Sequence, residues 1–212
     1  MNRKEKIKSQ LSPFLPSGYS DYITDLILQN TVRFVISKPR KTKHGDFSSK
    51  DREGSKFHKI TINGNLNKYQ FLITTLHEFA HLLIYEKHKN RVKPHGFEWK
   101  SEFKRLLIPV INDENIPIEL RRVLNKPVSK IKASSSTDIE LKRVLNTFDT
   151  HKKIQVITLE EIELHEYFKF DNNVFQLGEL RRTRFICRKA KTKKLYLINR
   201  LAEVEPLKNY SE

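Results

Sequence analysis

The sequence predicts an α+β fold in which helices and a small sheet come first and a small β-ribbon module follows. A long apolar stretch of helical character covers residues 69–85. Residues 58–63 alternate between apolar and polar side chains, as a half-buried strand does. From Tyr167 onward the sequence consists of short β-type runs separated by turn residues. The first part of the chain therefore combines helical and β signals, and the part from Tyr167 onward is mainly of β type.

Composition limits the classes of protein to which this chain can belong. Its 212 residues, 37% of them hydrophobic, can build one ordinary domain or two small ones. No uncharged apolar run reaches the length of about 18 residues needed to span a membrane, and no apolar segment follows the charged N-terminus. We therefore expect a cytoplasmic protein without membrane contact. A single cysteine, Cys187, excludes an internal disulfide and fits a reducing compartment.

The second compositional signal is an excess of positive charge. A formal net charge of +16 predicts a polyanionic partner, most simply DNA, because each phosphate contacted releases counterions. The alternative is a generally basic surface. We favour nucleic acid because residues 181–200 contain nine lysines or arginines and no acidic residue, and a second basic run covers residues 38–43.

The first sixty residues predict helices and short strands. Residues 1–30 are helical in pattern, with an interruption at residues 13–18. Residues 38–54 are polar and basic and predict a loop. Three stretches predict strands by their β-branched, aromatic or alternating composition: residues 32–36, 45–48 and 58–63. Asn65 or Asn67 can then cap the long helix that follows.

That helix, over residues 69–85, is the centre of the prediction because it carries His77, Glu78 and His81 in an apolar run. Positions four apart lie on one helical face, so the two imidazoles can point at one metal ion, as in the H-E-x-x-H zinc pattern. A lone histidine is more often a hydrogen-bonded core residue, and Glu78 could be a surface carboxylate. Burying all three groups without partners, however, costs about 2 kcal/mol or more for each, and a bound cation removes that cost.

A third zinc ligand is expected after this helix, since catalytic zinc usually has three protein ligands and one open position. His95 is the predicted ligand, because Pro94 ends the preceding helix and lets the chain turn back. Apolar residues at helical spacing predict a second helix over about residues 98–107 that packs on the first. His88 is the alternative, but it lies about two turns beyond His81, too far along the axis to share one metal.

These residues resemble a known family. His77-Glu78-Phe79-Ala80-His81, thirteen further residues, His95-Gly96 and the aromatic Trp99 are similar to the SprT family, which includes the Spartan DNA-dependent proteases. The resemblance covers residues 10–110. It implies a minimal zincin-like metalloprotease domain with one zinc ion per chain on His77, His81 and His95, and with Glu78 as general base.

The resemblance also extends upstream of the metal motif. A basic segment and a β-hairpin precede the active-site helix in that family, and residues 32–41 and 57–63 occupy this place here. From the general zincin arrangement we expect the strand through Ile60 and Ile62 to form the sheet edge to which an extended substrate peptide adds. A strand paired on both sides would exclude this role.

Beyond the second helix the sequence predicts a break and then a domain boundary. Pro109 and Pro117 end that helix, and a short helix follows over residues 119–124. Residues 126–136 have the proline and serine content of an exposed linker. The expected division has three parts: a metalloprotease domain of residues 1–125, the linker of residues 126–136, and a basic α/β-ribbon module of residues 137–212.

The second module predicts a helix followed by strands, with a short helix through Glu160 and Glu161 that Thr158 can cap. Thr137 and Glu140 have capping-box spacing at the start of the helix. Five stretches predict strands: residues 153–157, 168–170, 174–177, 182–188 and 195–198. Alternation in the fourth stretch places Arg182, Arg184 and Arg188 on one face. The candidate nucleic-acid-binding residues are the basic side chains of this region: Arg181, Arg182, Arg184, Arg188, Lys189 and Lys191.

Many SprT-like proteins end in a zinc ribbon held by paired cysteines, and the short strands of this module resemble that layout. Only Cys187 is present here, so the sequence departs from the pattern and we expect no ribbon zinc. Aromatic and aliphatic side chains must then pack the module in place of the metal.

Motif and charge together lead to one favoured function. We expect a zinc metalloendopeptidase that cleaves proteins on or near DNA, recruited there by the basic module. Glu78 would take a proton from a zinc-activated water and pass it to the leaving amine. One alternative is a nucleic-acid-binding or regulatory protein with a structural or vestigial zinc site. The other is a zinc hydrolase with a small or non-peptide substrate.

Overall fold

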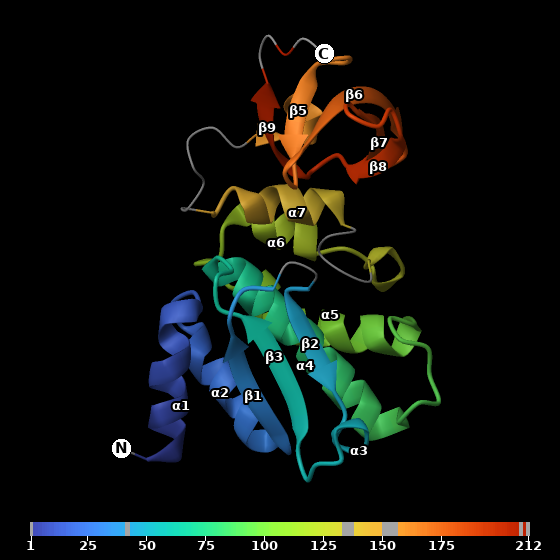
Figure 1. Ribbon diagram of the computed structural model, residues 1–212. Coiled ribbons are helices and arrows are strands. Elements are labelled where there is room, and N and C mark those ends of the chain that lie inside the picture. The colour runs from blue at the N-terminus through green and yellow to red at the C-terminus, as the bar shows by residue number, and fades with distance from the viewer. Residues whose placement is uncertain (1, 41–42, 133–137, 150–156, 208–209, 211–212) are drawn as a thin grey trace. The chain divides into compact units, whose positions relative to one another are not determined.

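The computed structural model divides into two compact units, Met1–Asp149 and Thr150–Glu212 (Figure 1). The residues that it describes are 2–40, 43–132, 138–149, 157–207 and 210. The predicted α+β class is confirmed, because the first unit joins helices to a three-stranded sheet and the second carries a six-stranded antiparallel sheet. Within the described ranges, none of the helices combines the length and apolar character needed to cross a bilayer.

The first unit begins with the helices predicted for residues 1–30. They are α1 (Arg3–Leu11), a 3-10 turn (Ser12–Phe14) and α2 (Tyr19–Gln29). Asn2 caps α1 in a capping box, since its side chain accepts the Glu5 N–H at 2.9 Å and the Glu5 carboxylate accepts the Asn2 N–H at 3.0 Å. Gly18 begins α2 with φ of 87°, a conformation that glycine adopts without strain.

Three strands form a mixed sheet in the order β1-β3-β2, and all three were predicted: β1 (Val32–Ser37), β2 (Gly45–Ser48) and β3 (His58–Asn63). β3 is parallel to β1 and antiparallel to β2. The expectation that β3 is a substrate-binding edge is therefore wrong, because β3 is paired on both sides. The sequence could not show this pairing. Alternation of apolar and polar residues identifies the core-facing side of β3, where Ile60 and Ile62 are buried, but it is the same in edge and central strands. A short helix that was not predicted, α3 (Lys50–Glu53), lies between β2 and β3.

The central helix α4 (Lys68–His88) packs against β2 and β3, behind the sheet in Figure 1. Asn67 caps it as predicted, its side chain accepting the Gln70 N–H at 2.9 Å. The next helix, α5 (Phe97–Asn112), packs on α4 and continues through Pro109, so the predicted end before this proline is wrong. Leu106, Leu107 and Val110 are at most 2% exposed. Burying three such side chains, at about 1.5–3 kcal/mol each, outweighs the roughly 3 kcal/mol cost of an interior proline.

The end of the first unit differs from the predicted boundary at residues 126–136. The chain continues in α6 (Ile118–Leu124), a 3-10 turn (Val128–Lys130) and α7 (Ile139–Asn146), and the division falls after Asp149. Leu141 and Leu145 of α7 are buried in the core of the first unit, which explains why this helix belongs there. Asp138 caps α7 and accepts a hydrogen bond from Lys126 at 2.9 Å. Thr137, the predicted cap, lies outside the described residues.

The second unit is a sheet with the strand order β4-β9-β5-β6-β7-β8. Its strands are β4 (Ile157–Thr158), β5 (Tyr167–Phe170), β6 (Asn173–Arg181), β7 (Arg184–Lys189), β8 (Leu195–Asn199) and β9 (Glu203–Leu207), and a 3-10 turn (Leu159–Glu161) follows β4. The strand predicted over residues 153–157 falls outside the described residues except for its last position. The sequence did not predict β9, because Pro206 disfavours a strand. Pro206 is tolerated since it lies beyond the short pairing of β4 with β9 and opposes only Phe168 of β5.

The arginine-rich strand is shorter than predicted. β7 begins at Arg184, whereas Arg182 lies in the turn after β6 with φ of 58°, so Arg182 does not share a strand face with the other arginines. Arg184 and Arg188 do lie on one face of β7, as predicted. Cys187 points to the opposite side and is fully buried in the core, where burial raises the pKa of its thiol to about 11.

Candidate metal centre

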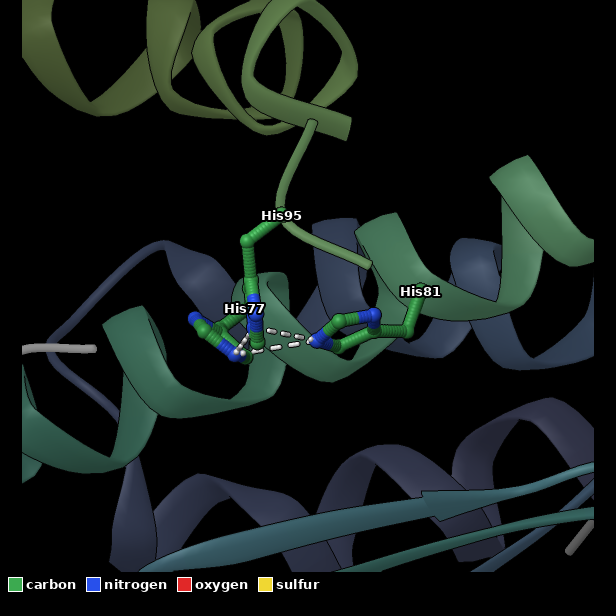
Figure 2. A group of neighbouring side chains, drawn as sticks. All are labelled: His77, His81 and His95. Atoms are coloured by element: carbon green, nitrogen blue, oxygen red, sulfur yellow. Dashed lines mark hydrogen bonds between the residues drawn. The ribbon is translucent and has the colours of Figure 1, made fainter. Parts of the chain in front are cut away.

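Three histidine side chains converge in the first unit. Figure 2 shows His77 and His81 projecting from successive turns of α4 and His95 reaching them from the segment before α5. The Nε2 atom of His81 lies 3.2 Å from that of His77 and 2.9 Å from that of His95, and the Nε2 atoms of His77 and His95 are 3.4 Å apart. The structure thus brings together the three histidines predicted from the spacing, and His88 is outside the group.

This donor set fits a tetrahedral zinc ion. Two nitrogens at about 2.0–2.1 Å from one zinc ion lie about 3.3 Å apart at the tetrahedral angle. The three observed Nε2 separations, between 2.9 and 3.4 Å, lie close to that value. Each Nε2 carries either one proton or one lone pair in its ring plane, so three converging Nε2 atoms cannot all satisfy one another by hydrogen bonding. A cation at the point of convergence satisfies all three.

Burial keeps these imidazoles neutral. Burial, followed by the proximity of His81 and His95, lowers the pKa of His77 to about 3. Burial and the neighbouring His95 lower the pKa of His81 to about 4, and burial also lowers the pKa of His95 below its ordinary value of 6.5. Metal ions bind the neutral form of imidazole, so the three rings are in their metal-binding form at pH 7.

A tight reversal of the chain delivers His95 to the cluster. Lys89 ends α4 with φ of 53°, and His95 itself has φ of 58°, a left-handed conformation that costs a residue with a side chain about 1–2 kcal/mol. The Gly96 N–H donates to the Lys93 carbonyl at 2.9 Å, and a Cβ at Gly96 would lie 2.9 Å from the same oxygen. Glycine is therefore needed after His95. Backbone strain at such a position is typical of functional sites.

Glu78 is buried beside the cluster, with 7% of its surface exposed. The backbone of β2 approaches it closely: the Phe47 N–H donates a hydrogen bond to its carboxylate, and a Cβ on Gly45 would lie only 2.7 Å from its Oε1 atom. Burial, followed by the proximity of Asp46, raises the pKa of Glu78 to about 8 although the Phe47 N–H opposes the shift. A nearby divalent cation favours the ionised carboxylate. A metal ion on the adjacent His77 would therefore lower the pKa of Glu78.

Two contributors to this site were not predicted. Gly45 lies in the basic loop of the sequence, where only the Gly-Asp-Phe-Ser strand signal pointed to it, and nothing local indicated its contact with Glu78. Trp99 was predicted as the aromatic residue of the motif and as an apolar position of the second helix, but its contact with the histidines was not predicted. In the structure its indole lies against the rings of His77, His81 and His95, with centroid separations of 4.7, 5.2 and 4.7 Å.

The predicted nucleic-acid-binding residues belong to the second unit, whereas the three histidines belong to the first. Five of them are exposed: Arg181, Arg182, Arg184, Arg188 and Lys191. Lys189, at the end of β7, is half-buried. Arg181, Arg182 and Arg184 lie around the turn between β6 and β7. Arg188 and Lys189 lie at the other end of β7, and Lys191 is in the turn that follows it.

An α+β unit in which an H-E-x-x-H helix and the following turn bring three histidines together has the arrangement of a zincin-like metal site. Residues 15–122 match the SprT-like family. The match covers just over half of the 212 residues and includes all three histidines, so this chain belongs to the SprT-like family. Comparison with curated proteins and with solved structures gave no match. The family resemblance predicted from the motif is confirmed.

The choice of His95 over His88 can be tested by metal analysis. We expect about one zinc per purified chain, and we expect His95→Ala to lose most of it because two imidazoles alone make an incomplete site. His88→Ala is the matched control and should keep the wild-type zinc content. Equal zinc in both variants, measured by plasma mass spectrometry after gel filtration, would contradict the assignment of His95.

The pKa of Glu78 predicts a pH-dependent stability of the metal-free protein. Between pH 4.5 and about 8 the unfolded carboxyl is ionised while the folded one keeps its proton, so the free energy of unfolding falls as pH rises through this window. Glu78→Gln does not titrate and should be more stable than wild type at pH 8.5 but not at pH 4.5. Each kcal/mol corresponds to about 2–4 °C in Tm. A Tm difference between the two proteins that is constant with pH would show that Glu78 ionises normally.

Proposed function

We propose that this chain is a zinc metallopeptidase that cleaves proteins on or near DNA. The observation that carries the proposal is the convergence of three neutral imidazoles next to a buried carboxylate, in a chain of the SprT-like family. His77, His81 and His95 would hold the zinc ion. When bound, zinc polarises the scissile carbonyl and makes water a stronger nucleophile.

Glu78 is the proposed general base. Its carboxylate accepts a proton from the attacking water and delivers it to the leaving amine, which completes peptide-bond hydrolysis. The Phe47 N–H holds the carboxylate, and burial excludes bulk water from it. Because Gly45 has no side chain, the β2 backbone can lie against Glu78 without displacing it.

The outer edge of β2 is the proposed binding site for the substrate backbone. In the described part of the chain β2 is paired with β3 alone, so its other edge has no strand partner. Gly45 and Phe47 place this strand directly beside the general base. An extended peptide that adds to β2 gains main-chain hydrogen bonds with little selection among side chains. This mode suits a protease that acts on many different proteins.

DNA is the proposed partner of the second unit. The exposed arginines around the β6–β7 hairpin supply positive charge for phosphate contacts. A hollow of about 550 Å³ in this unit is lined by Phe175, Tyr196, Arg184 and Lys189 among others. Phe175 is buried and Tyr196 is exposed, so the Tyr196 ring is the one on which a base of single-stranded nucleic acid would stack while phosphates pair with the cations.

Hydrolysis of casein or of the chain itself, with and without single-stranded DNA, tests the proposed activity. Wild type should cleave, DNA should stimulate cleavage, and Glu78→Gln should lower the rate by about 100-fold or more while zinc stays bound. Zinc and DNA binding without cleavage in wild type would support a binding or regulatory protein instead. Efficient cleavage by the zinc-loaded Glu78→Gln variant would rule out Glu78 as the base.

Salt dependence tests the proposed DNA contacts. Replacing both Arg184 and Arg188 by alanine should weaken binding to single-stranded DNA and reduce the slope of log K against log salt by about one to two, since each phosphate contact contributes close to one. Lys4→Ala with Lys8→Ala, which removes two exposed positive charges from α1, is the matched control. Equal loss in both double variants would indicate a general charge effect and no interface on β7.

A further inference from the structure

We infer that Trp99 is a positioning residue that fixes the ring orientations of all three histidines, an inference that rests on the proposed metal centre. Trp99 lies in the first turn of α5 and is 1% exposed. Its ring meets those of His77 and His95 edge-on, with interplanar angles of 61° and 80°, and lies tilted by 33° against that of His81. One indole thus contacts side chains from both segments that form the site.

Metal-binding imidazoles usually need such support. In most metal sites the second ring nitrogen donates to a carboxylate or carbonyl, and this bond fixes the ring rotation. Within the described residues, the hydrogen bonds of His77, His81 and His95 join only their Nε2 atoms to one another. Ring packing therefore provides the orientation that a hydrogen bond provides elsewhere, and Trp99 is the ring that packs on all three.

The surroundings of Trp99 indicate that its shape matters more than its polarity. Its Nε1–H is buried and has no hydrogen-bond partner among the described residues. Phe103, one turn further along α5, stacks on the indole at 5.0 Å with an interplanar angle of 25°, and its ring also meets that of His77 alone among the three histidines, at 5.6 Å. The indole is the largest aromatic side chain, and a phenyl ring in its place leaves part of the imidazole cluster without contact. A Trp99→Phe variant should therefore keep the fold and loosen the cluster.

Trp99 is also the single tryptophan of the chain, so all tryptophan emission comes from the metal site. In wild type we expect Co²⁺, whose unfilled d shell quenches nearby fluorophores, to quench this emission to a plateau at one equivalent. In Trp99→Phe, and in Trp99→Tyr as a second variant, we expect zinc affinity to fall at least about tenfold. This is the lower end of the usual effect of removing groups that orient metal ligands. Competition with a chromophoric chelator measures the affinity. The visible spectrum of bound Co²⁺ should also change, because it reports ligand geometry.

Phe71→Leu provides the matched control. Phe71 is fully buried on α4 and stacks on Phe14 at 5.4 Å, away from the three histidines. It should lower stability yet leave zinc affinity and the Co²⁺ spectrum unchanged. Wild-type affinity and spectrum in both Trp99 variants would overturn the inference, as would an equal loss of affinity in Phe71→Leu. If wild type binds neither metal, the proposed function fails as well, whereas metal-binding wild type with unaffected Trp99 variants defeats the positioning role alone.

Discussion

Helix α4 must be buried along most of its length and yet carry two imidazoles and a carboxylate, and this constraint explains much of the first unit. Ten of its residues are buried, and Glu78 is one of them. A buried polar group without a partner destabilises the fold, so each of these groups needs a hydrogen bond, a ring contact or a metal ion beside it. The β2 backbone matches Glu78 through the Phe47 N–H. The two histidines of α4 are matched by His95, by Trp99 and, in the proposed holoprotein, by zinc.

The same constraint explains two unusual backbone features. His95 adopts a strained left-handed conformation because only a tight turn between α4 and α5 returns its imidazole to the cluster. Gly45 lacks the Cβ that would collide with Glu78, which lets an edge strand pass beside the proposed general base. Strain and close approach therefore occur where the site is assembled. Both features are typical of a site in which function is favoured over local stability.

The metal ligands could be predicted from the spacing of residues that are close in sequence. Contacts between segments that are distant in sequence could not be predicted. The four-residue spacing of His77 and His81, and a histidine that follows a proline, identified all three members of the cluster. The prediction that Pro94 ends the helix is wrong, because α4 already ends at His88 and Lys89 turns the chain. The order of the sheet could not be predicted, because alternation in β3 is the same for an edge and a central strand. The continuation of α5 through Pro109 and the placement of α7 in the first unit both depend on tertiary burial. Likewise, the contact of Gly45 with Glu78 exists only once β2 has paired with β3.

X-ray absorption at the zinc K-edge of protein loaded with one equivalent of zinc tests the central claim most directly. The three-histidine centre requires a first shell of nitrogen and oxygen scatterers at about 2.0–2.1 Å, with the outer-shell pattern of about three imidazoles. A first shell containing sulfur near 2.3 Å would contradict this centre. So would a shell of oxygens without imidazole scattering, because zinc would then be bound somewhere other than at His77, His81 and His95.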